Sequence, residues 1–318
     1  MKNIYSNIQK VNKKNLAKAL KCLENNELVG VPTETVYGLA GNAYSIKSIK
    51  KIYKLKNRPT INPLIVHYYN IARLKKDAIL NKAFFKLYKK FCPGPITFVL
   101  QKKKGSKITS YILAKLETLA VRFPSHKATR ELLKNLSFPL AIPSANKSGG
   151  ISPVSAKDVA EEFKDKLKLI INGGNSNIGI ESTVIDLTTS NIKILRPGII
   201  QKKEINKILG IKISNLNKNK KINSPGLLKK HYSPGIPMKL NQKKAGYNEA
   251  FITFGKKYKN VKNTFNLSKK SNLKEAAKNL YKIFRKIKKL KYVKICVVKI
   301  PNKGVGIAIN DRLTRASN

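Results

Sequence analysis

Acidic residues are scarce in this chain, and tryptophan is absent. Its 318 residues include 66 Lys and Arg but only 16 Asp and Glu, so the formal net charge is +50. Such a charge favours a polyanion such as RNA, through phosphate contacts and counter-ion release. The lysines are spread along the whole chain, however, and abundant Lys, Asn and Ile are also typical of an AT-rich coding sequence. The charge therefore leaves both interpretations open.

Cysteine and histidine are also rare, with three of each. Cys22, Cys92 and Cys296 lie far apart, and none belongs to a CxxC pair. This spacing predicts neither a disulfide framework nor a structural metal site, and it favours a reducing cytoplasm. No apolar run approaches the roughly 18 residues of a membrane helix. The basic N-terminus lacks the apolar region of a signal peptide. We expect a cytoplasmic protein without a membrane segment.

Several common catalytic motifs are missing. The chain has no Walker A pattern, no GxGxxG after its first predicted strand, no HExxH and no GxSxG. Ordinary P-loop, dinucleotide-binding and hydrolase functions are therefore disfavoured.

The chain up to about Gly198 alternates short apolar runs with amphipathic stretches, which predicts an α/β or α+β sheet domain. Strands are expected at 28–31, 64–66, 96–100, 119–123, 167–171, 183–187 and 192–195, and helices from Ser45, Asn81, Ser125 and Ser155. A segment dense in Pro and Gly follows, and after it come two more strands (251–254 and 293–300), a helical stripe (273–287) and a short final helix. We expect a catalytic domain at 1–200, a linker at 201–237 and a small α/β domain at 238–318.

Polar clusters follow several of these strands, where ligands bind in α/β sheets. The first cluster holds Thr33, Glu34, Thr35 and Tyr37. Its hydroxyls and carboxylate could hold an amino acid or a phosphate, or form an ordinary polar turn.

Two cations lie close together before Pro59. Lys56 and Arg58 are two residues apart, so in an extended chain they would face the same way and could clamp a triphosphate. A solvated basic loop is the alternative. His67, at the end of a predicted strand, is either a ligand or a structural histidine.

A second arginine interrupts an apolar run at Arg122, where a buried cation needs an anionic partner or a ligand. Ser144 and Asn146 precede a Gly-Gly turn whose backbone N–H groups could face an anion. Ser182 and Arg196 lie on neighbouring predicted strands, although turn chemistry and a surface arginine would explain them equally well.

These clusters resemble the YrdC-like threonylcarbamoyl-AMP synthase family in its long, two-domain form. The matching strings are PTETVYGL, KLKNRPTINPL, CPGPITFVL, LAVRFP, PSANKSGGISP, ESTVID and LRPG, in the family's order over roughly residues 20 to 200. The strings SPGLLKKHYSP and AINDRLTRA are similar to the long form specifically, although Ile307 stands where a basic residue is usual.

The resemblance implies a fold and a reaction. The fold is a YrdC-like twisted mixed sheet with flanking helices, followed by a smaller Rossmann-like α/β domain. The reaction converts L-threonine, bicarbonate and ATP to threonylcarbamoyl-AMP and diphosphate. A partner transferase complex then moves the threonylcarbamoyl group to the adenosine beside the anticodon of certain tRNAs.

The resemblance also implies residue roles. It assigns L-threonine to Thr35, His67, Arg122, Ile142 and Ser182. It assigns ATP to Arg58, Asn62, Thr118, Ser144, Ser152, Arg196 and Tyr232. Lys56 and Arg58 would neutralise charge on the leaving pyrophosphate, together with Mg²⁺. Tyr232 lies in the linker, which could then close over the nucleotide as a lid. No metal-ligating residues are assigned.

Two other functions stay open at this point. One is a tRNA- or double-stranded-RNA-binding protein without catalysis, which the charge favours but the clustered Thr, Ser and Asn do not explain. The other is a carbamoyltransferase that adenylates carbamate. Such proteins carry extra domains with zinc-type cysteine clusters, and this chain lacks those clusters.

Overall fold

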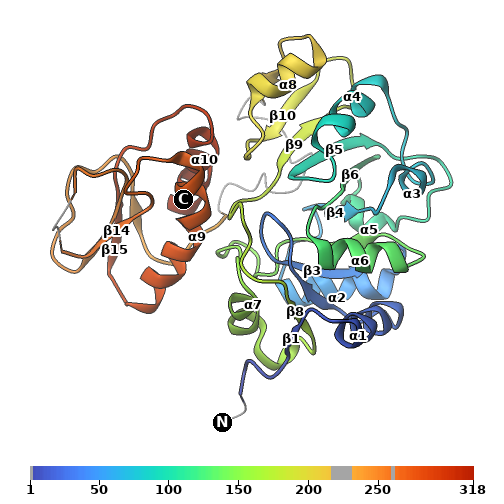
Figure 1. Ribbon diagram of the computed structural model, residues 1–318, viewed down its shortest axis with the longest axis horizontal. Helices are drawn as coiled ribbons and strands as arrows, with labels where there is room; N and C mark the ends of the chain where they lie inside the picture. Colours follow the sequence, from blue (N-terminus) through green and yellow to red (C-terminus); the bar gives the residue numbers. More distant parts are fainter. Residues whose placement is uncertain (1–2, 216–230, 259–261) are drawn as a thin grey trace.

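The computed structural model describes residues 3–215, 231–258 and 262–318. Within these ranges the chain forms an 11-stranded sheet and a separate 4-stranded sheet, each covered by helices (Figure 1). The predicted α/β class with a mixed main sheet and a second, smaller domain is confirmed. No helix in these ranges is long and apolar enough to cross a membrane.

The larger sheet mixes parallel and antiparallel neighbours in the order β1-β8-β2-β3-β7-β4-β6-β5-β9-β10-β11. Its strands are β1 (Ile8–Lys10), β2 (Val29–Val31), β3 (Gly38–Asn42), β4 (Ile65–His67), β5 (Ile96–Gln101), β6 (Thr118–Arg122), β7 (Leu140–Ala141), β8 (Ile170–Asn172), β9 (Thr183–Asp186), β10 (Lys193–Arg196) and β11 (Ser214–Asn215). The central pair β4 and β6 is parallel and sets His67 opposite Arg122. Two residues of the candidate site are thereby neighbours at one end of the sheet.

Helices cover both faces of this sheet: α1 (Lys13–Glu24), α2 (Ile46–Lys56), α3 (Ile71–Leu74), α4 (Lys82–Phe91), α5 (Ser110–Leu113), α6 (Lys127–Asn135), α7 (Ala156–Phe163) and α8 (Lys202–Leu209), with a 3-10 turn at Lys164–Lys166. Ser45, Asn81 and Ser155 are N-caps whose side chains accept a backbone N–H, as their positions before the apolar stretches predict. The helix expected from Ser125 begins at Lys127, with His126 as its cap.

Alternate residues of the strands point into two separate apolar cores. In β8, for example, Ile170 packs with the layer of α2, α4 and α7, whereas Ile171 packs with α1 and α6 on the other face. The centre of the larger core is aromatic, because Phe84 of α4 lies edge-on to Phe98 of β5 with ring centroids 5.0 Å apart. The sheet between these two cores is a rigid support for the loops at its ends.

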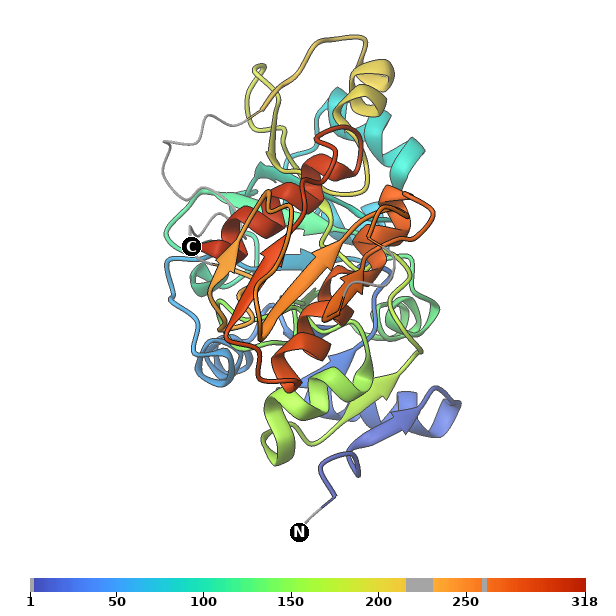
Figure 2. The ribbon, with the colours of Figure 1, turned by 90° about the vertical axis from the view of Figure 1, so that its left-hand side faces the viewer.

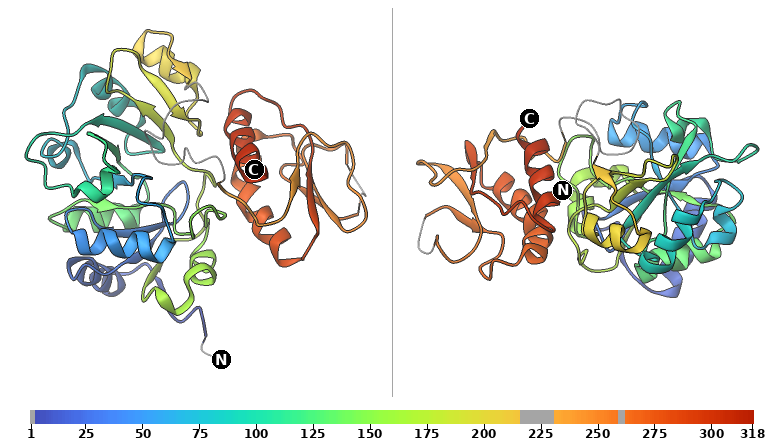
Figure 3. Two further views of the ribbon diagram at one scale, coloured as in Figure 1. Left: turned by 180° about the vertical axis from the view of Figure 1, so that it is seen from behind. Right: turned by 90° about the horizontal axis from the view of Figure 1, so that it is seen from above.

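The smaller sheet is entirely parallel, in the order β12-β15-β13-β14. Its elements are β12 (Met238–Lys239), β13 (Glu249–Thr253), β14 (Thr264–Asn266), α9 (Leu273–Lys289), β15 (Lys294–Val297) and α10 (Gly306–Ser317). The predicted helical stripe of α9 is buried along its length. Helices α9 and α10 lie between the small sheet and the larger domain (Figures 1 and 3), and Figure 2 shows the small sheet in front of them.

Part of the segment expected as a linker folds with the larger domain. Helix α8 buries Ile205 and Leu209 in the larger core, and β11 pairs in parallel with β10. The apolar residues Ile205, Ile208 and Leu209 have helical spacing, which outweighs the lysines between them. Of the expected linker, residues 216–230 lie outside the described residues. The chain then reaches β12 through residues 231–237.

The two domains touch through close backbone packing and buried charge. Gly179 has a φ of +82°, and a Cβ atom there would lie 2.5 Å from the Cα of Lys278 in α9. Beside this contact, Arg285 of α9 lies 3.8 Å from Asp158 and 3.7 Å from Glu162 of α7. The position of α9 against the larger domain therefore requires glycine at 179.

We expect Gly179→Ala to lower the free energy of unfolding by about 2 kcal/mol or more, because it adds left-handed backbone strain and a clash with α9. Urea unfolding measures the loss. Gly210→Ala is the matched control, since Gly210 also has positive φ, at +73°, but its Cβ would meet nothing within 4 Å. Equal losses in the two variants would contradict the close approach of α9.

Candidate active site

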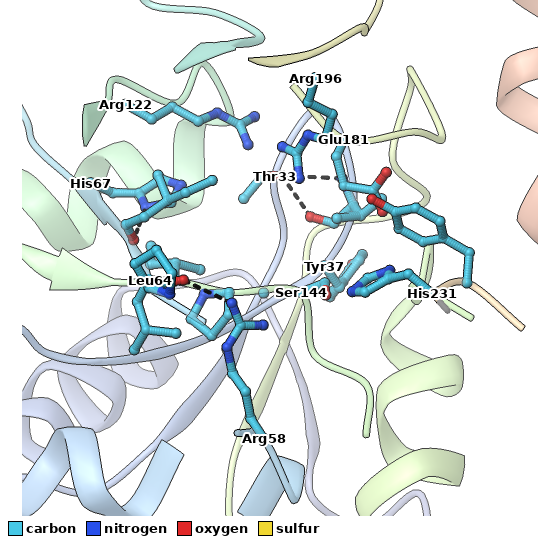
Figure 4. Close-up of a pocket in the computed structure, with 17 residues that line it drawn as sticks. Thr33, Tyr37, Arg58, Leu64, His67, Arg122, Ser144, Glu181, Arg196 and His231 are labelled. Carbon is cyan, nitrogen blue, oxygen red and sulfur yellow. Dashed lines mark hydrogen bonds between the residues drawn. The ribbon is translucent and has the colours of Figure 1, made fainter. Parts of the chain in front are cut away.

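A polar cleft opens at one end of the larger sheet, where loops from distant parts of the sequence converge (Figure 4). It takes in about 560 Å³ of space, open solvent at its mouth included. Its walls come from the loop after β2, the ends of β4, β6 and β10, the turns after α2 and β7, and residues just before β9. His231 and Tyr232 close one side.

Arg122 enters the cleft from the end of β6. Its guanidinium Nη2 donates to the Glu34 carboxylate at 2.8 Å and to the Thr35 hydroxyl at 2.8 Å. The buried cation thus has the structural ion-pair partner that its apolar surroundings demand. Its Nε is buried without a hydrogen-bond partner among the described residues, so the pair does not satisfy Arg122 completely.

Arg58 and Arg196 are the other two arginines on the cleft wall, and in the described chain neither has a carboxylate within ion-pair distance. Arg58 donates to the backbone carbonyls of Asn62 at 3.1 Å and Pro63 at 2.8 Å. Arg196 donates to the backbone carbonyl and the hydroxyl of Ser182, both at 3.2 Å. Burial lowers the pKa of Arg58 to about 10, which still leaves it charged at neutral pH. These two uncompensated cations favour an anionic ligand.

Glu181 is a buried carboxylate on the same wall. Its Oε1 accepts from the Ser152 hydroxyl at 2.6 Å, and its Oε2 accepts from the Tyr281 hydroxyl and from Arg312 Nε, both at 3.0 Å. Burial alone would raise the pKa of this carboxyl, but the charges of Arg312 and then Arg196 outweigh burial and hold the pKa at about 2. Glu181 is therefore fully ionised at neutral pH.

Buried polar atoms in or directly behind the cleft have no hydrogen-bond partner among the described residues. They are Nε of Arg122, Nη2 of Arg312, Nδ1 of His231, the Tyr232 hydroxyl and both side-chain polar atoms of Asn62. Because an unsatisfied buried polar group costs roughly 1–3 kcal/mol, such a cluster is typical of a site that a polar ligand completes.

Both histidines of the cleft are neutral. Burial lowers the pKa of His231 to about 3, against an attraction to Glu181, and burial together with Arg122 lowers the pKa of His67 well below its usual value. His67 Nδ1 lies 3.2 Å from the carbonyl oxygen of Ile65. Neither ring can act as a cation toward an anionic ligand at neutral pH.

The cleft brings together seven of the residues that the resemblance assigns to substrates: Arg58, His67, Arg122, Ile142, Ser144, Arg196 and Tyr232. Thr33 and Tyr37 of the first polar cluster also line it. Three more lie directly behind its wall. Thr35 accepts from Arg122, Ser182 accepts from Arg196, and Ser152 donates to Glu181.

Lys56 does not line the cleft, and the extended-chain argument for it is wrong. Lys56 is the last residue of α2, and Asn57 caps that helix with a left-handed φ of 47°. The Lys56 ammonium donates to the backbone carbonyls of Ser144 and Asn146. Burial, followed by the charge of Arg58, lowers its pKa well below the usual value. Lys56 supports the loop that carries Ser144.

Asn62 and Thr118 also lie off the cleft wall. Asn62 is fully buried, and its backbone carbonyl accepts from Arg58. Thr118 begins β6, four residues from Arg122. At about 3.3 Å per strand residue, this puts Thr118 roughly 13 Å from Arg122, at the opposite end of the strand.

The sequence prediction missed Glu181, His231 and Arg312, and it did not pair Glu34 with Arg122. Glu181 and His231 belong to the quoted strings ESTVID and SPGLLKKHYSP, but a single carboxylate or histidine in a turn has no distinctive spacing. A signal was available for Arg312, because arginine is rare in this chain and this one lies among the apolar residues of a helix. Its partner, 131 residues away, could not be read from spacing.

The fold and the cleft are those of a two-domain α/β enzyme. Over residues 21–198 the chain matches a family model described as "Telomere recombination", and over residues 200–318 a model described as "Threonylcarbamoyl-AMP synthase, C-terminal domain". The chain belongs to the threonylcarbamoyl-AMP synthase family, which confirms the resemblance drawn from the motif strings.

Curated relatives and a solved structure agree over most of the length. The threonylcarbamoyl-AMP synthase of Pyrococcus abyssi is 36% identical over 93% of this chain and 92% of its own. That of Bacillus subtilis is 33% identical over 95% of this chain and 92% of its own. The crystal structure of P. abyssi Sua5 complexed with L-threonine superposes with a TM-score of 0.88 at 32% identity, covering 98% of this chain and 96% of that one. These relatives favour the synthase over the RNA-binding and carbamoyltransferase alternatives.

The low pKa of Glu181 predicts that the folded protein loses stability in acid. Its pKa falls from 4.5 to about 2 on folding, so its ionisation adds stability that is complete above about pH 4.5 and is lost as the pH falls toward 2. We expect urea unfolding of the wild type to lose about 3 kcal/mol through this group between pH 5 and pH 2, a loss that Glu181→Gln does not show.

Glu24→Gln, on the exposed side of α1, is the control for that series and should follow the wild-type curve. If Glu181→Gln ran parallel to the wild type over the same pH range, Glu181 would not be the strongly paired carboxylate that its contacts indicate.

Proposed function

We propose that this cleft joins L-threonine, bicarbonate and ATP to give threonylcarbamoyl-AMP and diphosphate. The observation that carries the proposal is the convergence of Arg58, Arg122 and Arg196 from three separate segments on one cleft. Three cations in one small space, Arg122 and Arg196 buried and Arg58 half-buried, exceed what the protein's own carboxylates there compensate. A substrate set that contains a carboxylate and a triphosphate would supply the missing anions.

Figure 4 shows the cleft in two halves, with Arg122 and His67 on one side and Arg196, Glu181 and His231 on the other. We assign L-threonine to the half built by Thr35, His67, Arg122, Ile142 and Ser182. Arg122 would receive the amino acid carboxylate through its unpartnered Nε, while Glu34 keeps the guanidinium in place. The neutral ring of His67 and the apolar Ile142 leave room for the threonine side chain without adding charge.

We assign ATP to the other half, where Arg58 and Arg196 carry charge that no carboxylate pairs among the described residues. Ser144 and Tyr232 line the cleft there, and Ser152 fixes Glu181. Asn62 lies off the cleft wall and would act by orienting Arg58 through its backbone carbonyl. Thr118 belongs to the same set by family resemblance alone. Lys56 would act indirectly, by holding the Ser144 loop in place.

The chemistry requires positioning more than proton transfer. The threonine amine and bicarbonate give a carbamate and water. A carbamate oxygen then forms a bond to the α-phosphorus of ATP as the bond from that phosphorus to the β-phosphate oxygen breaks. A carboxylate nucleophile has no proton to lose, so no general base is needed. Arg58 and Arg196 would stabilise the charge that develops on the departing diphosphate.

Magnesium would reach this site with ATP. Within the described ranges, no three His, Cys, Asp or Glu residues gather into a group that could hold a metal ion. Glu181 on the cleft wall and Glu34 beside Arg122 are both occupied by arginines. The donor set therefore does not fit a magnesium ion held by the protein, whereas phosphate oxygens are common ligands of this ion.

A transferase complex would take the adenylate and modify tRNA in a reducing cytoplasm. A mixed carbamic–phosphoric anhydride is prone to hydrolysis, which favours direct transfer to a partner. The net charge of +50 would assist an encounter with tRNA, and Cys22, Cys92 and Cys296 are all free thiols.

Arg58→Ala should lower kcat/KM for ATP by about 10²- to 10³-fold, as expected when one group that stabilises developing negative charge is removed. Pyrophosphate release with ATP, Mg²⁺, bicarbonate and L-threonine measures it. Arg73→Ala is the matched control, because Arg73 also donates to backbone carbonyls, those of Leu133, Lys134 and Leu136, but lies off the cleft wall. Equal losses of kcat/KM in both variants would contradict the assignment of Arg58 to the ATP site.

Arg122→Lys should raise KM for L-threonine roughly 10- to 100-fold, because it keeps the charge but loses the planar fork. The KM for ATP should stay within about threefold in the same assay. If Arg122→Lys raised only the KM for ATP, Arg122 would not belong to the half of the cleft assigned to L-threonine.

A further inference from the structure

We propose that Arg312 of the C-terminal domain is a positioning residue for the nucleotide: by neutralising Glu181, it leaves Arg196 available to phosphate. The inference rests on the proposed function, because it concerns the half of the cleft assigned to ATP. It gives the second domain a defined part in the reaction, although none of that domain's described residues lines the cleft.

Arg312 lies on α10, and its side chain is completely buried. Its Nε donates to Glu181 at 3.0 Å, and its Nη1 donates to the carbonyl of Pro197 at 2.8 Å and to Asp311 at 2.8 Å. Pro197 directly follows Arg196, so the same guanidinium holds both the acid on the cleft wall and the backbone beside the cleft cation. Arg312 itself does not reach the cleft.

The effect follows from counting charges on the wall. Glu34 is paired with Arg122 and Glu181 with Arg312, which leaves Arg58 and Arg196 without a carboxylate among the described residues. Glu181 nevertheless lies close enough to Arg196 for each to shift the pKa of the other. Without Arg312, the remaining cation with the largest effect on the buried Glu181 would be Arg196. Such a pairing would divert Arg196 from the phosphates and make this wall of the cleft less positive.

Two tyrosines extend the same contact. The Tyr281 hydroxyl of α9 donates to Glu181, and its ring stacks on Tyr232 with centroids 5.7 Å apart. The Arg312 guanidinium lies over the ring of Tyr232, which lines the cleft, at 5.4 Å from its centroid. The backbone N–H of His231 donates to the carbonyl of Arg315 at 3.0 Å. Helices α9 and α10 thus hold both the acid and the aromatic side of the nucleotide half.

The test is a double-mutant cycle with Arg312→Met and Glu181→Gln, using the full-length protein. The affinity for ATP with Mg²⁺ is measured by calorimetry, and the KM for ATP and for L-threonine by pyrophosphate release. We expect Arg312→Met alone to weaken ATP binding about tenfold or more, which corresponds to loss of one hydrogen bond to a charged group. In the Glu181→Gln background the same change should have no further effect, since no charge remains to be neutralised.

Arg285→Met is the matched control, because Arg285 is another arginine of the small domain, partly buried, that contacts the larger domain through Asp158, Glu162 and the carbonyl of Ile151. It should leave the affinity for ATP unchanged even if it loosens the interface. Arg312→Lys keeps the charge, and we expect it to retain most of the affinity for ATP; it also serves if Arg312→Met fails to fold.

Three results would each overturn the inference, since each would indicate general support of the fold. The first is that Arg312→Met weakens ATP binding equally in both backgrounds. The others are that Arg285→Met weakens it as much as Arg312→Met does, or that Arg312→Lys loses the affinity for ATP completely. These results are distinct from failure of the proposed function. The proposed function would fail if the wild-type protein bound ATP but released no pyrophosphate in response to threonine. In that case the double-mutant cycle for ATP affinity can still be measured.

Discussion

The buried ion pair between Glu181 and Arg312 is the interaction on which the geometry of the cleft depends. It joins the two domains at the wall of the cleft that also carries Arg196 and His231. A carboxylate in such surroundings is tolerated only with a nearby cation and complete hydrogen bonding, and Ser152 and Tyr281 complete the set. The same rule explains Glu34 beside Arg122. What remains uncompensated in the cleft is positive charge, and this is the feature that a carboxylate and a triphosphate would match.

Much of the fold could be predicted from local pattern. Strands such as 96–100 and 119–123 are apolar runs of the right length, and the caps Ser45, Asn81 and Ser155 precede helical spacing. Helix α1 was missed, although its apolar residues Leu16, Ala19, Leu20 and Leu23 are three or four apart, because lysines dominate the stretch. The strand order could not be predicted, since neighbours such as β5 (Ile96–Gln101) and β9 (Thr183–Asp186) lie far apart in the sequence.

The candidate site was predictable where a residue type was unusual for its place, as with Arg122 inside an apolar run. The sequence prediction failed where it assumed the local conformation, as with Lys56, because an α-helix rather than an extended strand carries that residue. It also failed for Glu181 and Arg312, which are 131 residues apart and acquire meaning only as a pair. Buried charge is compensated in three dimensions, and a single sequence does not reveal which distant residues meet.

The most direct test of the central claim is the fate of labelled bicarbonate. The protein would be incubated with ¹⁴C-bicarbonate, ATP, Mg²⁺ and L-threonine, and the nucleotides separated at once. We expect a labelled adenylate that forms only when threonine and ATP are both present, in step with pyrophosphate release. Pyrophosphate release without label in any adenylate, or label incorporated equally well without threonine, would contradict the activation of a threonine carbamate in this cleft.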